Sequence, residues 1–232
     1  MTTKTALITG ATSGIGRATA YEFAKHGINL ILCGRRQDRL DNIQQALNKK
    51  VDVHILNFDV RHNEEVQKAI SSLPNHFKHI DILINNAGNA HGLDTIQDGD
   101  IDDWDAMMDG NVKGLLYVSK FIIPDLIRKK SGHIINIGSS AGRELYPKGN
   151  VYCASKHAVL AITEGMRIDL NPYNIKVSAI NPGLVETEFS QVRFKGDKIA
   201  DSVYKGYKAL QAEDVAEVIQ FAISRPAHVN IA

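Results

Sequence analysis

Short apolar runs alternate with longer amphipathic segments over the whole length of the chain. The apolar runs are rich in Ile, Leu and Val and show no internal polar alternation, as expected of strands covered on both faces of a sheet. They predict six strands, at residues 5–9, 29–33, 52–57, 82–85, 133–137 and 176–180. The amphipathic segments predict six helices, at residues 15–26, 39–48, 64–73, 101–129, 151–171 and 213–224. This alternation indicates an α/β fold, with a doubly wound parallel β-sheet and helices on both faces.

Composition narrows the class of protein. The 232 residues are 44% hydrophobic and 23% charged, which suits a single domain, residues 1–232, around one sizeable core. A formal net charge of +1 gives no basic footprint for nucleic acid or an anionic membrane, and no apolar run is long enough to span a bilayer. Neither the two cysteines, Cys33 and Cys153, nor the nine histidines have metal-ligand spacing. We therefore expect a cytoplasmic protein without a metal, whose partner is a small molecule.

A glycine-rich turn follows the first predicted strand and leads into the first predicted helix. Its spacing is Gly10-x-x-x-Gly14-x-Gly16. Gly10 permits a tight turn, whereas Gly14 and Gly16 let the backbone approach a pyrophosphate and let the helix pack closely on the sheet. The free N–H groups of the helix N-terminus attract the anion. A plain strand-to-helix turn would explain one glycine but not three, so the sequence predicts a nucleotide site.

Two arginines, Arg35 and Arg36, stand at the end of the second predicted strand. Many NAD sites have an acidic residue there, about 20 residues beyond the glycines, which binds the ribose hydroxyls. A carboxylate would repel a 2′-phosphate, whereas a guanidinium pairs with it. The arginine pair therefore predicts NADP as the cofactor. The alternative is that one or both arginines cap the next helix or face solvent.

A serine, a tyrosine and a lysine form the third signal. Ser139 follows the fifth predicted strand, and Tyr152 and Lys156 lie one helical turn apart on one face. Two unit charges about 4 Å apart interact by roughly 4 kcal/mol at an effective dielectric near 20, enough to bring a phenol's pKa toward neutrality. Such a tyrosine would serve as a general acid and base, and the serine could hydrogen-bond a reacting carbonyl. Each residue alone is more often a packing or solvated group, so the interpretation depends on the glycine turn and the arginines.

The chain resembles the short-chain dehydrogenase/reductase family over nearly its whole length, which implies a Rossmann-type NAD(P)-binding domain. Besides the features above, the motifs that carry the resemblance are Asn85-Asn86-Ala87-Gly88, Asn111, Asp59-Val60 and the segment from Pro182 to Thr187. Residues 34–40, 149–152, 189–197 and 226–231 resemble the NADP-dependent 3-hydroxy acid dehydrogenase subgroup. That likeness implies oxidation of the β-hydroxyl of a small acid of the serine, L-allo-threonine or 3-hydroxypropionate type, or reduction of the corresponding carbonyl.

The resemblance also implies roles for individual residues. Ser139 would orient the substrate, Tyr152 would be the acid and base, Lys156 would lower the tyrosine pKa, and Asn111 would support a proton relay. The implied cofactor contacts are Gly10, Thr12, Ser13, Gly14, Ile15, Gly16, Arg35, Arg36, Asp59, Val60, Asn86, Ala87, Gly88, Tyr152, Lys156, Pro182, Gly183, Val185 and Thr187. The family implies a homo-oligomer, a tetramer or dimer, although the last edge strand that helps build it would follow Ala232.

A small hydroxy acid needs a counter-charge for its carboxylate. Arg193 and Lys195 follow the Pro182–Thr187 motif, and Arg143 follows the serine. We expect Arg193 to bind the substrate, because the resemblance places the substrate loop here and a guanidinium suits a carboxylate. The alternative is that all three are surface charges or subunit contacts.

Other classes of protein remain open at this stage. Residues 138–142 match Gly-x-Ser-x-Gly, which in a hydrolase would make Ser140 the nucleophile with His157 or His228 downstream. A carbonyl reductase of another substrate class and a non-catalytic NADP(H) sensor would share the fold. The acidic run 98–105 lacks the glycine and the closing glutamate of a calcium loop, and we expect it to begin a helix.

Overall fold

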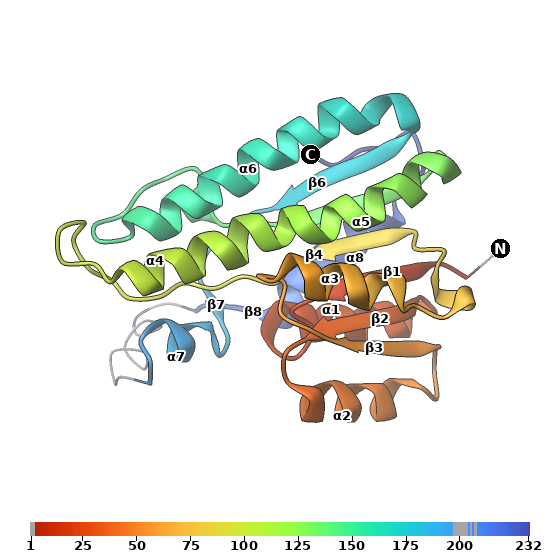
Figure 1. The fold of residues 1–232 in the computed structure, drawn as a ribbon, viewed down its shortest axis with the longest axis horizontal. Coiled ribbons are helices and arrows are strands. Elements are labelled where there is room, and N and C mark those ends of the chain that lie inside the picture. The colour runs from red at the N-terminus through yellow and green to blue at the C-terminus, as the bar shows by residue number, and fades with distance from the viewer. Residues whose placement is uncertain (1–2, 197–203, 205, 207) are drawn as a thin grey trace.

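Six parallel strands form the central sheet of the computed structural model, which describes residues 3–196, 204, 206 and 208–232 (Figure 1). The strand order is β3-β2-β1-β4-β5-β6. Strands β2 and β3 are therefore added on one side of β1, and β4, β5 and β6 on the other side, so the order of addition reverses between β1 and β4. The strands are β1 Thr5–Thr9, β2 Asn29–Gly34, β3 Val53–Asn57, β4 Ile82–Asn85, β5 Gly132–Ile137 and β6 Ile175–Ile180. Ligands of doubly wound sheets bind at such a reversal, beyond the carboxyl ends of the strands.

Helices cover both faces of this sheet, as predicted. One core cluster joins α1, α2 and α8 to one face, and a second joins α3, α5 and α6 to the other. The helices are α1 Gly14–Lys25, α2 Gln37–Leu47, α3 Asn63–Ser71, α4 Ile101–Met108, α5 Gly114–Lys129, α6 Asn150–Leu170, α7 Phe189–Arg193 and α8 Ala212–Ser224. Consecutive residues of β1, such as Leu7 and Ile8, contribute to opposite clusters, because side chains alternate across a strand. The buried apolar runs noted in the sequence follow from this double coverage.

A buried polar network ties the adjacent strands β4 and β5 to the helices that pack on them. Nδ2 of Asn85 on β4 donates to Ser119 Oγ and to Asn136 Oδ1, each at 2.9 Å. Nδ2 of Asn136 on β5 donates in turn to Thr163 Oγ1 on α6, also at 2.9 Å. Since buried amides are costly unless paired, these bonds hold β4, β5, α5 and α6 in one relative position.

The prediction of one continuous helix at residues 101–129 is wrong. The structure divides it into α4, a π-helical turn at Asp109–Lys113, and α5. Pro124 lies inside α5, and the division comes earlier in the chain. A π turn inserts one residue without a breaking residue such as proline, so the hydrophobic pattern on either side stays helical.

A small segment beyond β6, residues 185–193, was not predicted, and we call it the strap. It contains β7 Val185–Glu186 and α7, and β7 pairs in parallel with β8 Leu210–Gln211. Figure 1 shows β7 and α7 below the carboxyl end of β6, set apart from the central sheet. The 189–197 motif ends at a residue outside those described.

None of the helices in the described ranges is long and apolar enough to cross a membrane. The acidic run begins α4, as expected: Asp100 caps it by accepting from Asp102 N at 2.9 Å. Among the residues placed by the structure, no cluster of three or more His, Cys, Asp or Glu side chains could hold a metal ion.

Candidate active site

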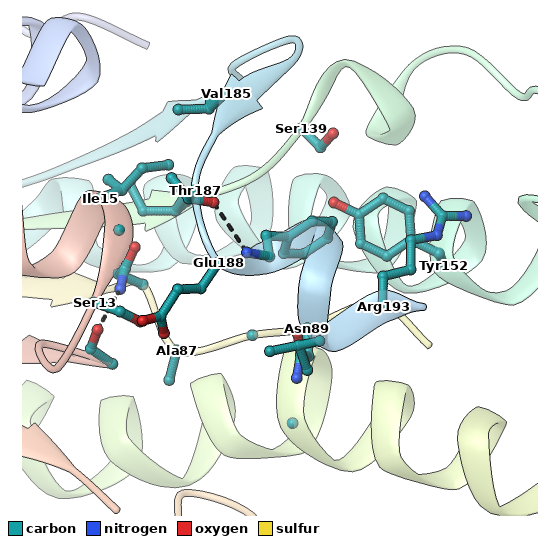
Figure 2. A pocket seen from close by; sticks show the side chains of 18 of the residues that line it. Ser13, Ile15, Ala87, Asn89, Ser139, Tyr152, Val185, Thr187, Glu188 and Arg193 are labelled. Carbon is teal, nitrogen blue, oxygen red and sulfur yellow. Dashed lines mark hydrogen bonds between the residues drawn. The ribbon is translucent and has the colours of Figure 1, made fainter. Parts of the chain in front are cut away.

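A cavity of about 720 Å³ lies beyond the carboxyl ends of the strands. Figure 2 shows it between the α1 N-terminus, Tyr152 and the strap that carries Val185, Thr187, Glu188 and Arg193. Of the predicted site residues, those that line it are Gly10, Thr12, Ser13, Gly14, Ile15, Arg35, Arg36, Asp59, Val60, Asn86, Ala87, Gly88, Ser139, Tyr152, Lys156, Pro182, Gly183, Val185, Thr187 and Arg193. Gly16 and Asn111 do not line it, and each supports it from behind.

The glycine turn is closed by Asn86. Its Nδ2 donates to the carbonyls of Thr9 at 2.9 Å and Gly10 at 3.2 Å. A β-carbon at Gly16 would lie 2.4 Å from that nitrogen and 2.5 Å from the Gly10 oxygen, so only glycine fits. Gly10 and Gly14 have positive φ angles of 64° and 50°. This packing exposes the first turn of α1 to the cavity.

That first turn has free N–H groups. Ser13 stands at the N-cap of α1, but its side chain makes no capping hydrogen bond. Its hydroxyl instead accepts from Arg36 Nη2 at 2.8 Å. The uncapped donors and the glycine cradle fit a pyrophosphate, whose negative charge the helix N-terminus favours.

Arg36 makes hydrogen bonds on two sides. Thr12 Oγ1 accepts from its Nε at 3.2 Å and its Nη2 at 3.0 Å. On the other side its Nη1 donates to Glu188 Oε2 at 2.9 Å, and Arg39 Nη1 donates to Glu188 Oε1 at 2.7 Å. The hydrogen bond from Arg36 is the largest cause that holds the pKa of Glu188 below its usual value, and Arg39 adds to it. This group of arginines fits an anion at the ribose end of the cavity.

Arg35 and Asp59 occupy the same end. Arg35 Nη1 lies 3.5 Å from Asp59 Oδ2 and is mostly exposed. Arg61 engages both oxygens of Asp59, at 2.7 Å to 3.1 Å. Burial raises the pKa of Asp59, but the hydrogen bonds and charges of Arg61, with that of Arg35, outweigh it and lower the pKa. Asp59 is therefore a carboxylate that pairs with two arginines at this end of the cavity.

Tyr152, Lys156 and Ser139 meet at the other end. Tyr152 is 9% exposed at the start of α6, and Lys156 Nζ lies 6.0 Å from its ring centroid. Lys156 Nζ donates to the Ile137 carbonyl at 3.0 Å, and Ser139 Oγ accepts from Ala141 N at 3.1 Å. Ser139 and the Tyr152 phenol face the same part of the cavity (Figure 2).

The expected depression of the tyrosine pKa is not observed in this structure. Burial raises the pKa of Tyr152 to about 12, against a hydrogen bond with Ser139 and the charge of Arg193, which lower it. Burial also lowers the pKa of Lys156 to about 8. The prediction rested on the attraction between the two charges, whereas desolvation on burial disfavours both charged forms.

Asn111 lies in the π turn between α4 and α5. It is 2% exposed, its Oδ1 accepts from Asn89 N at 2.6 Å, and its Nδ2 donates to Asn89 O and Ser155 Oγ. A β-carbon at Gly88 would lie 2.8 Å from Asn111 Oδ1 and 3.7 Å from Lys156 Nζ. Asn111 and Lys156 are therefore neighbours across Gly88.

Of the three candidate ligands for a substrate carboxylate, Arg193 on α7 is the one that reaches Tyr152. Its guanidinium carbon lies 5.6 Å from the Tyr152 ring centroid. Its Nε donates to Gly92 O at 3.0 Å and its Nη1 to the Tyr146 hydroxyl at 2.9 Å. Of the other two candidates, Arg143 is exposed and Lys195 pairs with Asp103 at 3.0 Å, and neither lines the cavity.

Tyr146 and Glu188 are two of the lining residues that were not predicted from the sequence. Tyr146 has no motif around it, and only the hydrogen bond from Arg193 reveals it. Glu188 could have been noticed as an acidic residue directly after the Pro182–Thr187 motif, but no pattern in the sequence connects it to Arg36.

The hydrolase alternative gains no support from the geometry. Ser140 is exposed, and His157 Nδ1 bonds to the Cys153 carbonyl within α6. In the part of the chain that the structure describes, neither His157 nor His228 forms a hydrogen bond with Ser140.

Comparison with known proteins agrees with the fold and the motifs. Residues 4–198 match the short chain dehydrogenase family. The chain is 46% identical over 227 residues to sulfoacetaldehyde reductase 2 of Chromohalobacter salexigens, covering 97% of this chain and 90% of the relative. It is 46% identical over 233 residues to an NADP-dependent 3-hydroxy acid dehydrogenase of Schizosaccharomyces pombe, covering 99% and 90%.

A solved structure is similar throughout. The closed form of serine dehydrogenase complexed with NADP+ superposes with a TM-score of 0.94 at 41% identity, covering 98% of this chain and 92% of that one. The strand order of the sheet and the glycine turn both agree with the match to this family. The chain therefore belongs to the short-chain dehydrogenase family.

Proposed function

We propose that this protein is an NADP(H)-dependent oxidoreductase that transfers a hydride between the nicotinamide and the β-hydroxyl or carbonyl of a small 3-hydroxy acid. One observation carries the proposal: a single cavity joins an arginine site beside the α1 N-terminus to a buried tyrosine with a guanidinium beside its ring. Relatives named as an NADP-dependent 3-hydroxy acid dehydrogenase and a serine dehydrogenase support it.

The residues of the cavity fit NADP(H). The free N–H groups of the first turn of α1 would bind the pyrophosphate, and Arg35 and Arg36 would bind the 2′-phosphate. The segment from Pro182 to Thr187 would contact the nicotinamide end. When bound, the nicotinamide supplies the hydride for reduction or accepts it in oxidation.

Tyr152 exchanges the proton with the substrate oxygen. Burial raises its pKa to about 12, so Tyr152 is a neutral phenol at neutral pH, the form that can donate a proton to a carbonyl in the reductive direction. Ser139 orients that oxygen by hydrogen bonding. Lys156 would pass the replacement proton toward the phenol, and Asn111, its neighbour across Gly88, would position a water that links the lysine to solvent.

Arg193 selects for an acid. Its Nη2 has no role in the bonds to Gly92 and Tyr146, and the guanidinium stands beside the Tyr152 ring. A 3-hydroxy acid has its anionic group two bonds from the reacting carbon, so a guanidinium and a phenol on neighbouring sites match it.

A substrate panel tests the proposal. Serine, L-allo-threonine, 3-hydroxypropionate and 3-hydroxyisobutyrate are oxidised with NADP+ or NAD+, and the corresponding carbonyls are reduced with NADPH, while the absorbance of the reduced cofactor is followed. We expect turnover of at least one acid with NADP+ preferred. Equal turnover of neutral alcohols would reject the acid specificity, and tight NADPH binding without any turnover would indicate a sensor.

We also propose a cytoplasmic homo-oligomer, a tetramer or a dimer, built on a single domain. Large apolar side chains are exposed on α5 and α6, including Leu116 at 41% and Ile168 at 75%. Light scattering of the purified protein tests the assembly, and a monomer at micromolar concentration would reject it.

A further inference from the structure

Glu188 contacts Arg36, which the proposed cofactor needs, and the nearby Arg39. Its two carboxylate oxygens accept from different guanidinium groups, Arg36 Nη1 at 2.9 Å and Arg39 Nη1 at 2.7 Å. Glu188 comes from the strap, whereas both arginines follow β2, some 150 residues earlier in the chain. Figure 2 shows its carboxylate reaching from the strap toward Ser13 at the α1 N-terminus.

A carboxylate and a 2′-phosphate can accept hydrogen bonds from the same guanidinium donors. Both are anions that accept charge-assisted hydrogen bonds from guanidinium groups, and two anions close together repel each other. We propose that Glu188 is a cofactor-selectivity residue: it occupies the arginine donors in the 2′-phosphate site and competes with the phosphate for them. This inference rests on the proposed NADP(H) function.

Glu188 is not needed to position Arg36. The Nε and Nη2 atoms of that arginine are held by Thr12 Oγ1 and Ser13 Oγ, three hydrogen bonds that do not involve the strap. Glu188 uses Nη1, which points away from them. Removing the carboxylate therefore frees a donor on an arginine that stays in place, so it favours the phosphate.

The competition is partial, because the pairs are accessible to water. The side chains of Arg36 and Arg39 are 39% and 38% exposed, and that of Glu188 is 45% exposed. Exposed ion pairs are weak, so the phosphate can displace the carboxylate. A nucleotide without a 2′-phosphate leaves both ion pairs intact. Glu188 therefore lowers the affinity for NADP(H) but not that for NAD(H), and the preference for NADP(H) becomes smaller.

Binding of 2′,5′-ADP and 5′-AMP by calorimetry tests the inference, since the two probes differ only in the 2′-phosphate. In Glu188→Gln we expect the Kd of 2′,5′-ADP to fall by about fivefold and that of 5′-AMP to stay within about twofold. Glu186→Gln is the matched control. Glu186 lies on the same strap, but its carboxylate accepts from Gln211 Nε2 at 3.1 Å, so both Kd values should match the wild type.

The other outcomes are decisive as well. A higher Kd for 2′,5′-ADP in Glu188→Gln would mean that Glu188 orients the arginines. Equal changes in Kd for both probes would mean a general distortion of the site. Either result would overturn this inference and leave the NADP(H) proposal standing. A wild type that binds both probes equally would overturn the NADP(H) proposal too. If Glu188→Gln unfolds, Glu188→Ala in the same assay must show the same fall in Kd.

Discussion

Arg193→Ala is the sharpest test of how the substrate is chosen. The guanidinium lies beside the Tyr152 ring and is the cationic group of α7 that faces the cavity. A hydrogen bond to a charged group contributes about 1.5–3 kcal/mol, which corresponds to an increase of about 10- to 150-fold in KM for a 3-hydroxy acid. Because the arginine would bind the carboxylate equally in ground and transition states, kcat should change much less.

The assay compares a hydroxy acid with an uncharged alcohol of similar size, both with NADP+. The alcohol corrects for lost packing, since Arg193 also donates to Tyr146 and Gly92 and its removal loosens that wall. Lys195→Ala is the matched control, because Lys195 lies two residues further on and pairs with Asp103 at 3.0 Å. Equal rises in KM for acid and alcohol would refute the proposed role of Arg193.

Three further predictions concern the rest of the site. Tyr152→Phe should reduce kcat by at least about 10²-fold, because it removes the proton donor, while the Kd of NADPH by fluorescence titration stays near that of the wild type; retained turnover would contradict the mechanism. Gly16→Ala should lower the free energy of unfolding in urea by about 1–3 kcal/mol, because its β-carbon meets the Gly10 carbonyl at 2.5 Å, and an unchanged value would show that the turn adapts. Lys156 has a folded pKa lowered to about 8, so its buried charge destabilises the protein at and below pH 8, and this penalty fades as pH rises toward the unfolded value of 10.5. Lys156→Met should therefore be more stable than the wild type by about 2 kcal/mol at pH 7.5, with a smaller difference at pH 9.5; a difference independent of pH would argue against a depressed pKa.

Much of the fold could be predicted from local pattern. The strand Thr5–Thr9 and the strand Ile82–Asn85 have the predicted bounds, because buried parallel strands are continuous apolar runs ended by polar residues. The glycine turn was equally readable, since its three glycines have distinct steric reasons that operate within eight residues of chain.

What could not be predicted depends on contacts between distant segments. The bond from Arg36 to Glu188 joins residues 152 positions apart, and no spacing rule connects them. The pKa of Tyr152 depends on how completely α6 and the strap bury it, so a pairwise argument from Tyr152 and Lys156 gave the wrong direction for this structure. Local sequence indicates which residues are present, whereas burial decides their protonation.

The π turn at Asp109–Lys113 has a consequence for insertions and deletions. A π turn takes up one extra residue within a single wider turn, so the helix on either side keeps its phase. After the turn, α5 buries Leu115, Val118, Ile122 and Leu126, a stripe that packs on the sheet. Deleting one residue from the turn would let α-helical hydrogen bonds close across it and leave that stripe in place, while Asn111 would lose the position that the wider turn gives it. Loss of activity and loss of folding are thus separable at this turn, so a shortened descendant could keep the fold and lose the site.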